Sequence, residues 1–139
     1  MSKPRLSEYR ALANFRYEIR KFLAFSEAAA RAAGIEPQHH QLLLAVHGLP
    51  EGVRPTIGAL AERLCLKHHT TVGLVDKLEE RGLAVRVRSD ADRREVLVSL
   101  TADGTALLRR LSQQHRDELR NAGVSMVAAL TEILDTRLD

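Results

Sequence analysis

Basic side chains are concentrated in one short part of the chain, where their chemistry suits binding of a polyanion. Five arginines lie between residues 81 and 94, and Asp90 and Asp92 are the acids that oppose them there. Phosphate groups are bound by cations gathered on one surface, whereas the whole chain carries a formal net charge of only +3. The local concentration of charge therefore predicts contact with nucleic acid. The alternative is that these arginines form a solvated hairpin edge.

Two short helices are predicted immediately before the arginines. From Ile57 to Leu64, apolar side chains recur on one helical face, and Thr56 precedes them as a candidate N-cap. A second helix is expected from about His68 to Arg81, and Gly82 ends it because glycine readily takes the left-handed conformation. The inward side chains of this second helix are expected to be Val72, Val75 and Leu78. Its opposite face would carry His69, Thr70, Gly73 and Lys77.

The residues that follow have the period of two β-strands. Val85 and Val87 alternate with Arg86 and Arg88, and the segment from Val96 to Leu100 alternates in the same way. The polar sequence SDADRRE between them predicts a hairpin tip. Two helices followed by a charged hairpin make a winged helix-turn-helix, which puts one helix in a DNA major groove and a β-tip beside it.

Three motifs in this region resemble those of a known family, the multiple antibiotic resistance regulator (MarR) type of bacterial transcription regulators. They are LVDKLEERGL at residues 74–83, the Asp-x-Arg tip at residues 92–94, and LTADG at residues 100–104. They occur in the family's order and spacing, and the flanking helices fit the family plan over nearly the whole chain. The resemblance implies a cytoplasmic homodimer that binds pseudo-palindromic operator DNA and is often released by a small molecule.

The residues and the resemblance together predict which side chains meet DNA. The resemblance implies that Arg94 reaches toward a minor groove and that Asp92 orients it by a charge-assisted bond. Groove-facing residues are expected to be His69, Thr70, Thr71 and Lys77. Phosphate contacts are expected from Lys67, His68, Arg86, Arg88 and Arg93. With Gly73, the predicted DNA-binding set is Lys67, His68, His69, Thr70, Thr71, Gly73, Lys77, Arg86, Arg88, Asp92, Arg93 and Arg94.

Two positions depart from the family pattern. Lys67 and His68 stand where relatives often have a Ser-Pro-type helix cap, and a lysine side chain cannot accept a hydrogen bond from the helix N-terminus. Gly73 stands where relatives often carry a larger polar or basic residue on the DNA face. This glycine removes one possible base contact and leaves room for closer approach of the backbone, so the base preference of relatives does not transfer.

The two ends of the chain predict long helices that need a partner. All five aromatic residues fall within the first predicted helix, about residues 7–33. A leucine-rich helix is expected from about residue 107, and another after a break near residues 121–123. Their apolar stripes favour intertwined terminal helices of a two-fold dimer. Packing within one helical monomer is the alternative.

The predicted fold is therefore mainly α with a small β-hairpin wing: a winged helix-turn-helix with N- and C-terminal dimerisation helices. A single domain would cover residues 1–139. Its dimerisation helices would occupy residues 1–35 and 102–139, around a DNA-binding lobe at residues 36–101. A further helix from Pro37 to His47, with Leu42, Leu43 and Val46 inward, would bridge the two regions.

A small ligand is also implied by the resemblance, since aromatic or phenolic molecules often bind between the terminal helices and the DNA-binding lobe in this family. Tyr17, Phe22 and His47 are the candidate ligand residues. The alternative is that the aromatic side chains simply pack a dimer interface. Two other readings of the same fold remain open: a metal- or redox-responsive regulator, and a winged-helix adaptor that binds protein.

Other chemistry finds little support in the sequence. The histidines lack metal-ligand spacing, and the one cysteine, Cys65, has no partner for a disulfide and is expected to be buried and inert. No nucleophile stands beside a base, and no glycine-rich phosphate loop follows a strand, so no enzyme and no cofactor are predicted. No targeting segment or membrane span is expected, which fits a cytoplasmic protein that binds double-stranded DNA.

Overall fold

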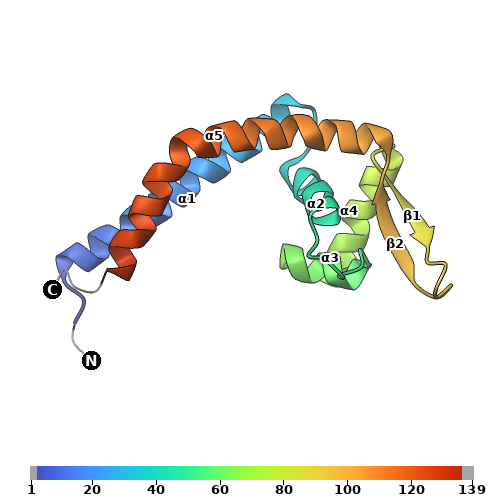
Figure 1. The fold of residues 1–139 in the computed structure, drawn as a ribbon, viewed down its shortest axis with the longest axis horizontal. Helices are drawn as coiled ribbons and strands as arrows, with labels where there is room; N and C mark the ends of the chain where they lie inside the picture. The colour runs from blue at the N-terminus through green and yellow to red at the C-terminus, as the bar shows by residue number, and fades with distance from the viewer. Residues whose placement is uncertain (1–2, 136–139) are drawn as a thin grey trace. The chain divides into compact units, whose positions relative to one another are not determined.

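The computed structural model describes residues 3–135, which form five helices and one two-stranded hairpin (Figure 1). The predicted fold class, mainly α-helical with a small β-hairpin wing, is confirmed. In chain order the elements are α1 (Leu6–Ala32), α2 (Pro37–His47), α3 (Ile57–Leu64), α4 (His68–Glu80), β1 (Ala84–Arg88), β2 (Val96–Leu100) and α5 (Ala102–Leu134).

The chain divides into two compact units. We call the unit from Ala30 to Leu111 the central lobe, and the unit formed by α1 up to Ala29 with α5 from Ser112 the helical pair. In the central lobe, α2, α3 and α4 pack together with the hairpin. Its fully buried core includes Leu42 and Leu43 from α2, Leu60 from α3, Val75 and Leu78 from α4, and Val98 from β2. Of the three inward residues predicted for α2, Leu42 and Leu43 are buried and Val46 is half-buried.

Capping groups fix the ends of the short helices. The predicted N-cap of α3 is confirmed, because the Ala59 backbone N–H donates to Thr56 Oγ1 over 3.1 Å. Cys65 ends α3 in the left-handed conformation, with φ of 55°. Its side chain is exposed, so the expectation of a buried Cys65 was wrong. The reason is its position in the tight turn after α3, where the backbone N–H bonds back into the helix and the side chain points outward.

The LTADG motif forms a close junction between the hairpin and α5. The Thr101 hydroxyl donates to the Gly82 carbonyl (2.7 Å) and accepts from the Gly104 backbone N–H (3.0 Å), so it caps α5 and ties it to the end of α4. A Cβ placed on Gly104 would lie 2.0 Å from the Leu83 carbonyl oxygen. Only glycine allows the two backbones to approach this closely.

The predicted break near residues 121–123 was wrong, because α5 runs without interruption from Ala102 to Leu134. Glycine weakens a helix but does not by itself end one, and Gly123 does not take the positive φ that ends other helices here. The neighbouring residues also pack against α1 in the helical pair. Ser125 Oγ donates to Glu18 Oε2 over 3.3 Å, and Ala129 is buried. Packing of this kind outweighs a local propensity.

Candidate nucleic-acid interface

Helix α4 buries one face in the central lobe and exposes the other. Its buried residues are Thr71, Leu74, Val75 and Leu78. Thr71 was predicted to face a DNA groove, and this was wrong: its side chain is fully buried and its hydroxyl donates to the Lys67 carbonyl over 3.0 Å. Val72, predicted to be in the core, is only half-buried. Two of the three residues predicted to face inward, Val75 and Leu78, are buried, while Thr71 takes the place expected for Val72. Threonine tolerates this place because the helix backbone satisfies its hydroxyl.

The outer face of α4 carries a ridge of three residues one helical turn apart: His69, Gly73 and Lys77. All three are exposed, and Thr70 beside them is half-buried. Lys77 Nζ lies 3.6 Å from Glu80 Oε2, but both side chains are well exposed. Such a pair is weak in water, so Lys77 can exchange this carboxylate for a phosphate or a base at little cost.

The N-terminus of α4 is suited to an anion. Lys67 is the N-cap residue, and its side chain makes no capping hydrogen bond, as its chemistry requires. Lys67 and His68 are both exposed. The first N–H groups of a helix carry partial positive charge and attract phosphate, and the lysine ammonium adds a full charge at the same place.

One face of the hairpin lies against the lobe and the other is turned outward. Ala84 and Val98 are buried against the lobe, and Arg86 pairs directly with Val98 across the hairpin, so it lies on the same inner face. Val85 and Val87 lie on the outer face and are 41% and 47% exposed. Both faces of this hairpin mix apolar and polar residues, and a shift of one residue in register exchanges the faces entirely.

Arg86 binds carboxylates on α4. Its guanidinium pairs with Glu79 and, over 2.7 Å, with Asp76 Oδ1, while its backbone N–H donates to Glu79 Oε2 over 3.3 Å. Burial alone lowers the pKa of Arg86, but the bonds and charges of the two carboxylates raise it above its ordinary value. The predicted phosphate contact of Arg86 is therefore corrected. Its charge is already matched by two acids, and it joins the hairpin to α4.

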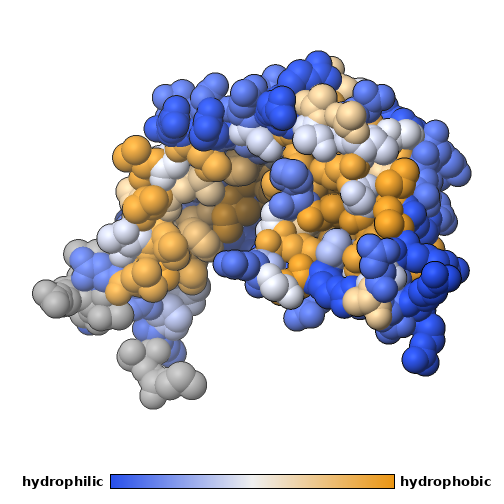
Figure 2. All heavy atoms as spheres, turned by 45° about the vertical axis from the view of Figure 1, so that its right-hand side comes forward, coloured by the Kyte–Doolittle hydropathy of each residue, from blue (hydrophilic) through white to orange (hydrophobic). Residues whose placement is uncertain are grey.

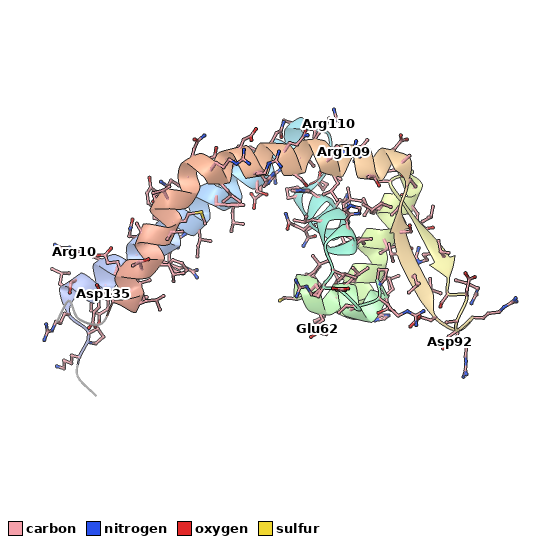
Figure 3. All side chains as sticks on the ribbon, in the orientation of Figure 1. Arg10, Glu62, Asp92, Arg109, Arg110 and Asp135 are labelled. Atoms are coloured by element: carbon pink, nitrogen blue, oxygen red, sulfur yellow. The ribbon has the colours of Figure 1, made fainter. Side chains whose placement is uncertain are left out.

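The tip of the hairpin presents the remaining arginines to solvent. Asp92 lies at the tip (Figure 3) and accepts from the Arg94 backbone N–H over 3.0 Å. The Arg94 guanidinium is 97% exposed, with its Nε 3.8 Å from the same carboxylate. Arg88 donates to the Arg93 carbonyl over 2.7 Å. The tip backbone is thus held in place while Arg93 and Arg94 extend outward.

Three residues that the sequence did not single out hold the base of this tip. The Ser89 hydroxyl is buried and accepts from the backbone N–H groups of Ala91 and Asp92, over 3.2 and 3.3 Å. Arg54 donates to the same hydroxyl over 2.5 Å and pairs with Glu95. Serine at the start of a polar loop is a recognisable turn signal. Nothing local in the sequence links Arg54 to residues 35 positions away.

The candidate ligand residues are divided between the two units. Tyr17 is exposed on α1, where the Lys21 ammonium lies 4.7 Å from the centre of its ring. Phe22, further along α1, packs on His115 with ring centroids 6.0 Å apart and lines a cavity of about 80 Å³ between α1 and α5 in the helical pair. His47 is exposed at the end of α2, in the central lobe. No group of three or more potential metal ligands was found within residues 3–135. A search of these same residues found no helix that is both long and apolar enough to cross a membrane.

Comparison with known proteins agrees with this geometry. Residues 33–95 match the model of the MarR family. Over 110 residues the chain is 33% identical to the organic hydroperoxide resistance transcriptional regulator of Bacillus subtilis, covering 72% of this chain and 69% of that protein. The chain belongs to the MarR family. Other curated transcription regulators match over about half of their own length.

Solved structures of MarR family regulators share the fold. AbsC from Streptomyces coelicolor superimposes with a TM-score of 0.76 over 100% of this chain and 94% of its own, at 20% identity. CouR from Rhodococcus jostii RHA1, in a structure bound to p-coumaroyl-CoA, is 29% identical with a TM-score of 0.55 and covers 78% of this chain and 67% of its own. As a member of the MarR family, the protein is a DNA-binding transcription regulator of the winged-helix type.

Proposed function

We propose that this MarR-family chain is a homodimeric repressor that binds a pseudo-palindromic operator. The observation that carries the proposal is the exposed ridge on α4 beside an arginine-bearing hairpin tip, within one compact lobe. A helix of this kind fits the major groove, and the tip fits the adjacent minor groove. A repressor acts by occupying the operator, and the proposed surface supplies the contacts that occupancy needs.

The contacts we propose divide by chemistry. His69, Thr70 and Lys77 face base edges, with Gly73 between them. Phosphates are bound by Lys67, His68, Arg88 and Arg93, all of which are exposed. Arg94 enters the minor groove, and Asp92 fixes the backbone from which it extends. Base contacts supply sequence preference, whereas phosphate contacts supply affinity that falls as salt rises.

The helical pair supports assembly into a dimer. Large apolar side chains on α1 and α5 are exposed to solvent, and Figure 2 shows such apolar surface on this part of the chain. Val124 is 72% exposed and Val127 is 67% exposed. A second copy would cover this surface and would supply the second α4 that a two-fold operator requires. We assign residues 1–35 and 102–139 to dimerisation and residues 36–101 to DNA binding, all within one domain. We place the action of the protein in the cytoplasm.

A small aromatic ligand is the regulator we propose for the dimer. CouR, the 29% identical structural relative, carries an aromatic acyl group in its bound p-coumaroyl-CoA. Within the helical pair, Tyr17 and Phe22 on α1 are the residues on which we place such a ligand, whereas the role of His47, in the central lobe, stays a prediction from the sequence. It would act by favouring a dimer geometry whose two α4 helices no longer match the half-sites, and its effect on DNA affinity cannot exceed its preference for that geometry.

The test begins with selection of bound fragments from a random pool of double-stranded DNA by the purified protein, followed by sequencing. The expected result is an inverted repeat with half-sites about 10 base pairs apart. Arg94→Ala should then weaken binding to the selected DNA by about 1–3 kcal/mol, the scale of one good nucleic-acid contact. Asp92→Ala should weaken it too, although a negative charge near DNA is removed. Enrichment of no sequence, or tighter binding by Asp92→Ala, would contradict these assignments.

A further inference from the structure

Gly73 lies on the exposed face of α4. The buried residues of the helix nearest to it in sequence are Thr71, Leu74 and Val75, and the helical period places Gly73 on the side opposite to them. It lies in the middle of a 13-residue helix, one turn from His69 on one side and one turn from Lys77 on the other. Glycine is among the least favourable residues at such a position, since it leaves the unfolded chain the most freedom.

Nothing within the described part of the chain explains this choice. A Cβ added to Gly73 would meet no heavy atom within 4 Å, so no internal close approach requires glycine. Its φ is not positive either, so the backbone conformation suits any residue. Gly104 provides the contrast, because an added Cβ there would collide with the Leu83 carbonyl oxygen. The fold requires Gly104 and does not require Gly73.

We propose that Gly73 determines how deeply α4 enters the major groove, because the helix backbone at this position lies against a base-pair edge with no room for a methyl group. This inference rests on the proposed role of α4 in operator binding. His69 and Lys77 flank the contact by one turn on each side, so the depth at Gly73 sets the reach of both side chains. Gly73 is therefore a specificity-determining residue, although glycine makes α4 less stable than alanine would.

The test compares the wild-type chain with Gly73→Ala on the DNA selected by the wild-type protein. Gly73→Ala should raise the melting temperature by about 2–6 °C, because alanine favours the helix. It should also weaken binding to the selected DNA by about tenfold or more, the scale of one lost base contact. Binding to unrelated DNA at low salt should change little, since it depends on phosphate contacts.

Gly58→Ala in α3 is the matched control, because its added Cβ meets nothing nearer than Thr56 Oγ1 at 4.0 Å. It should leave DNA affinity within about twofold of the wild type, well below the cost of a base contact. Gly73→Arg adds a cation and should still weaken binding to the selected DNA. The inference fails if Gly73→Ala binds as tightly as the wild type, if Gly73→Arg binds more tightly, or if Gly73→Ala lowers the melting temperature. A wild-type chain that selects no DNA would instead overturn the proposed function on which it rests.

Discussion

The central lobe and the helical pair differ in how far they bury their large apolar side chains. In the lobe, the large apolar residues that remain exposed are Leu44, Val53, Val85 and Val87, none more than 47% exposed. Among the described residues of the helical pair, ten large apolar residues are exposed, and several of them on α5 are more than two-thirds exposed. The lobe has a core of its own, whereas the pair has apolar surface that its own residues do not cover. Large uncovered apolar surface marks an interaction site, so the two units play different parts in the protein.

The largest expected effect comes from placing a charge in the uncovered surface. Val127→Asp should abolish assembly, because an unpaired charge buried in an apolar interface costs about 3 kcal/mol or more. DNA binding should fall with it, since a single chain holds only one α4. Light scattering and gel shifts measure the two effects. Gln114→Glu introduces the same charge at an exposed position of α5 that lies three or four residues from none of the exposed apolar residues, and it should change neither. If the two variants had equal effects, the exposed apolar face of α5 would not be the surface on which two copies meet.

Within the lobe, the closest backbone approach is the most sensitive point. Gly104→Ala should destabilise the chain by about 3 kcal/mol, the upper range for overpacking, because the new methyl collides with the Leu83 carbonyl rather than with a movable side chain. Urea unfolding followed by circular dichroism measures the loss. Gly58→Ala serves as the matched change without a collision. If Gly104→Ala unfolds at the same urea concentration as the wild type, the junction has room for the added methyl group and the expected collision does not occur.

The link between the hairpin and α4 should contribute less. Arg86→Ala leaves Asp76 and Glu79 without their shared cation, but these groups are partly exposed and solvent screens them, so the expected loss is about 1 kcal/mol of folding stability. Operator binding should weaken as well, since two negative charges on α4 are no longer neutralised. Arg86→Lys should recover part of both losses. If Arg86→Ala lowered DNA affinity without any loss of folding stability, the phosphate contact predicted from the sequence would explain Arg86 better than its link to α4.

The smallest effect concerns His39 and acid. Burial lowers the pKa of His39, with Glu36 opposing the shift and Arg81 and Lys77 adding to it. As pH falls below the ordinary value of 6.5, the unfolded chain takes up the proton before the folded one does. The stability that neutral His39 contributes is therefore present above this pH and is lost below it. His39→Gln should flatten the fall in melting temperature between about pH 7 and pH 5, the range in which histidine titrates. His68→Gln, at an exposed position, controls for loss of a histidine. An unchanged slope for His39→Gln would contradict the prediction.

Elements set by local chemistry were predicted well from the sequence. The range Pro37–His47 and the Thr56 cap were confirmed because each depends on residues within a few positions of one another. The face that a helix buries was harder to predict. Thr71 and Val72 are both β-branched, and only the packing of α2 and α3 against α4 decides which of them is buried. Contacts between residues far apart in the sequence, such as Arg54 with Ser89, could not be predicted, because no local pattern links them.

Two of the wrong predictions share a physical cause, since each gave a local preference more weight than packing. The expected break near Gly123 followed helix propensity, but packing of α5 on α1 keeps the helix intact. The phosphate contact expected for Arg86 followed from its charge, but its guanidinium pairs with two acids on α4. Cys65 was expected to be buried because cysteine usually is, but its place at a helix end exposes it.

We infer that a second copy of the chain completes the helical pair, whereas the lobe is complete in itself. Size-exclusion chromatography with light scattering on the intact protein tests it most directly. The expected result at micromolar concentration is twice the chain mass of 15.5 kDa for the free protein, and that mass plus the mass of the DNA duplex for the complex with the selected DNA. A well-folded, soluble monomer at that concentration would contradict the claim, because the apolar surface of α1 and α5 would then need no partner.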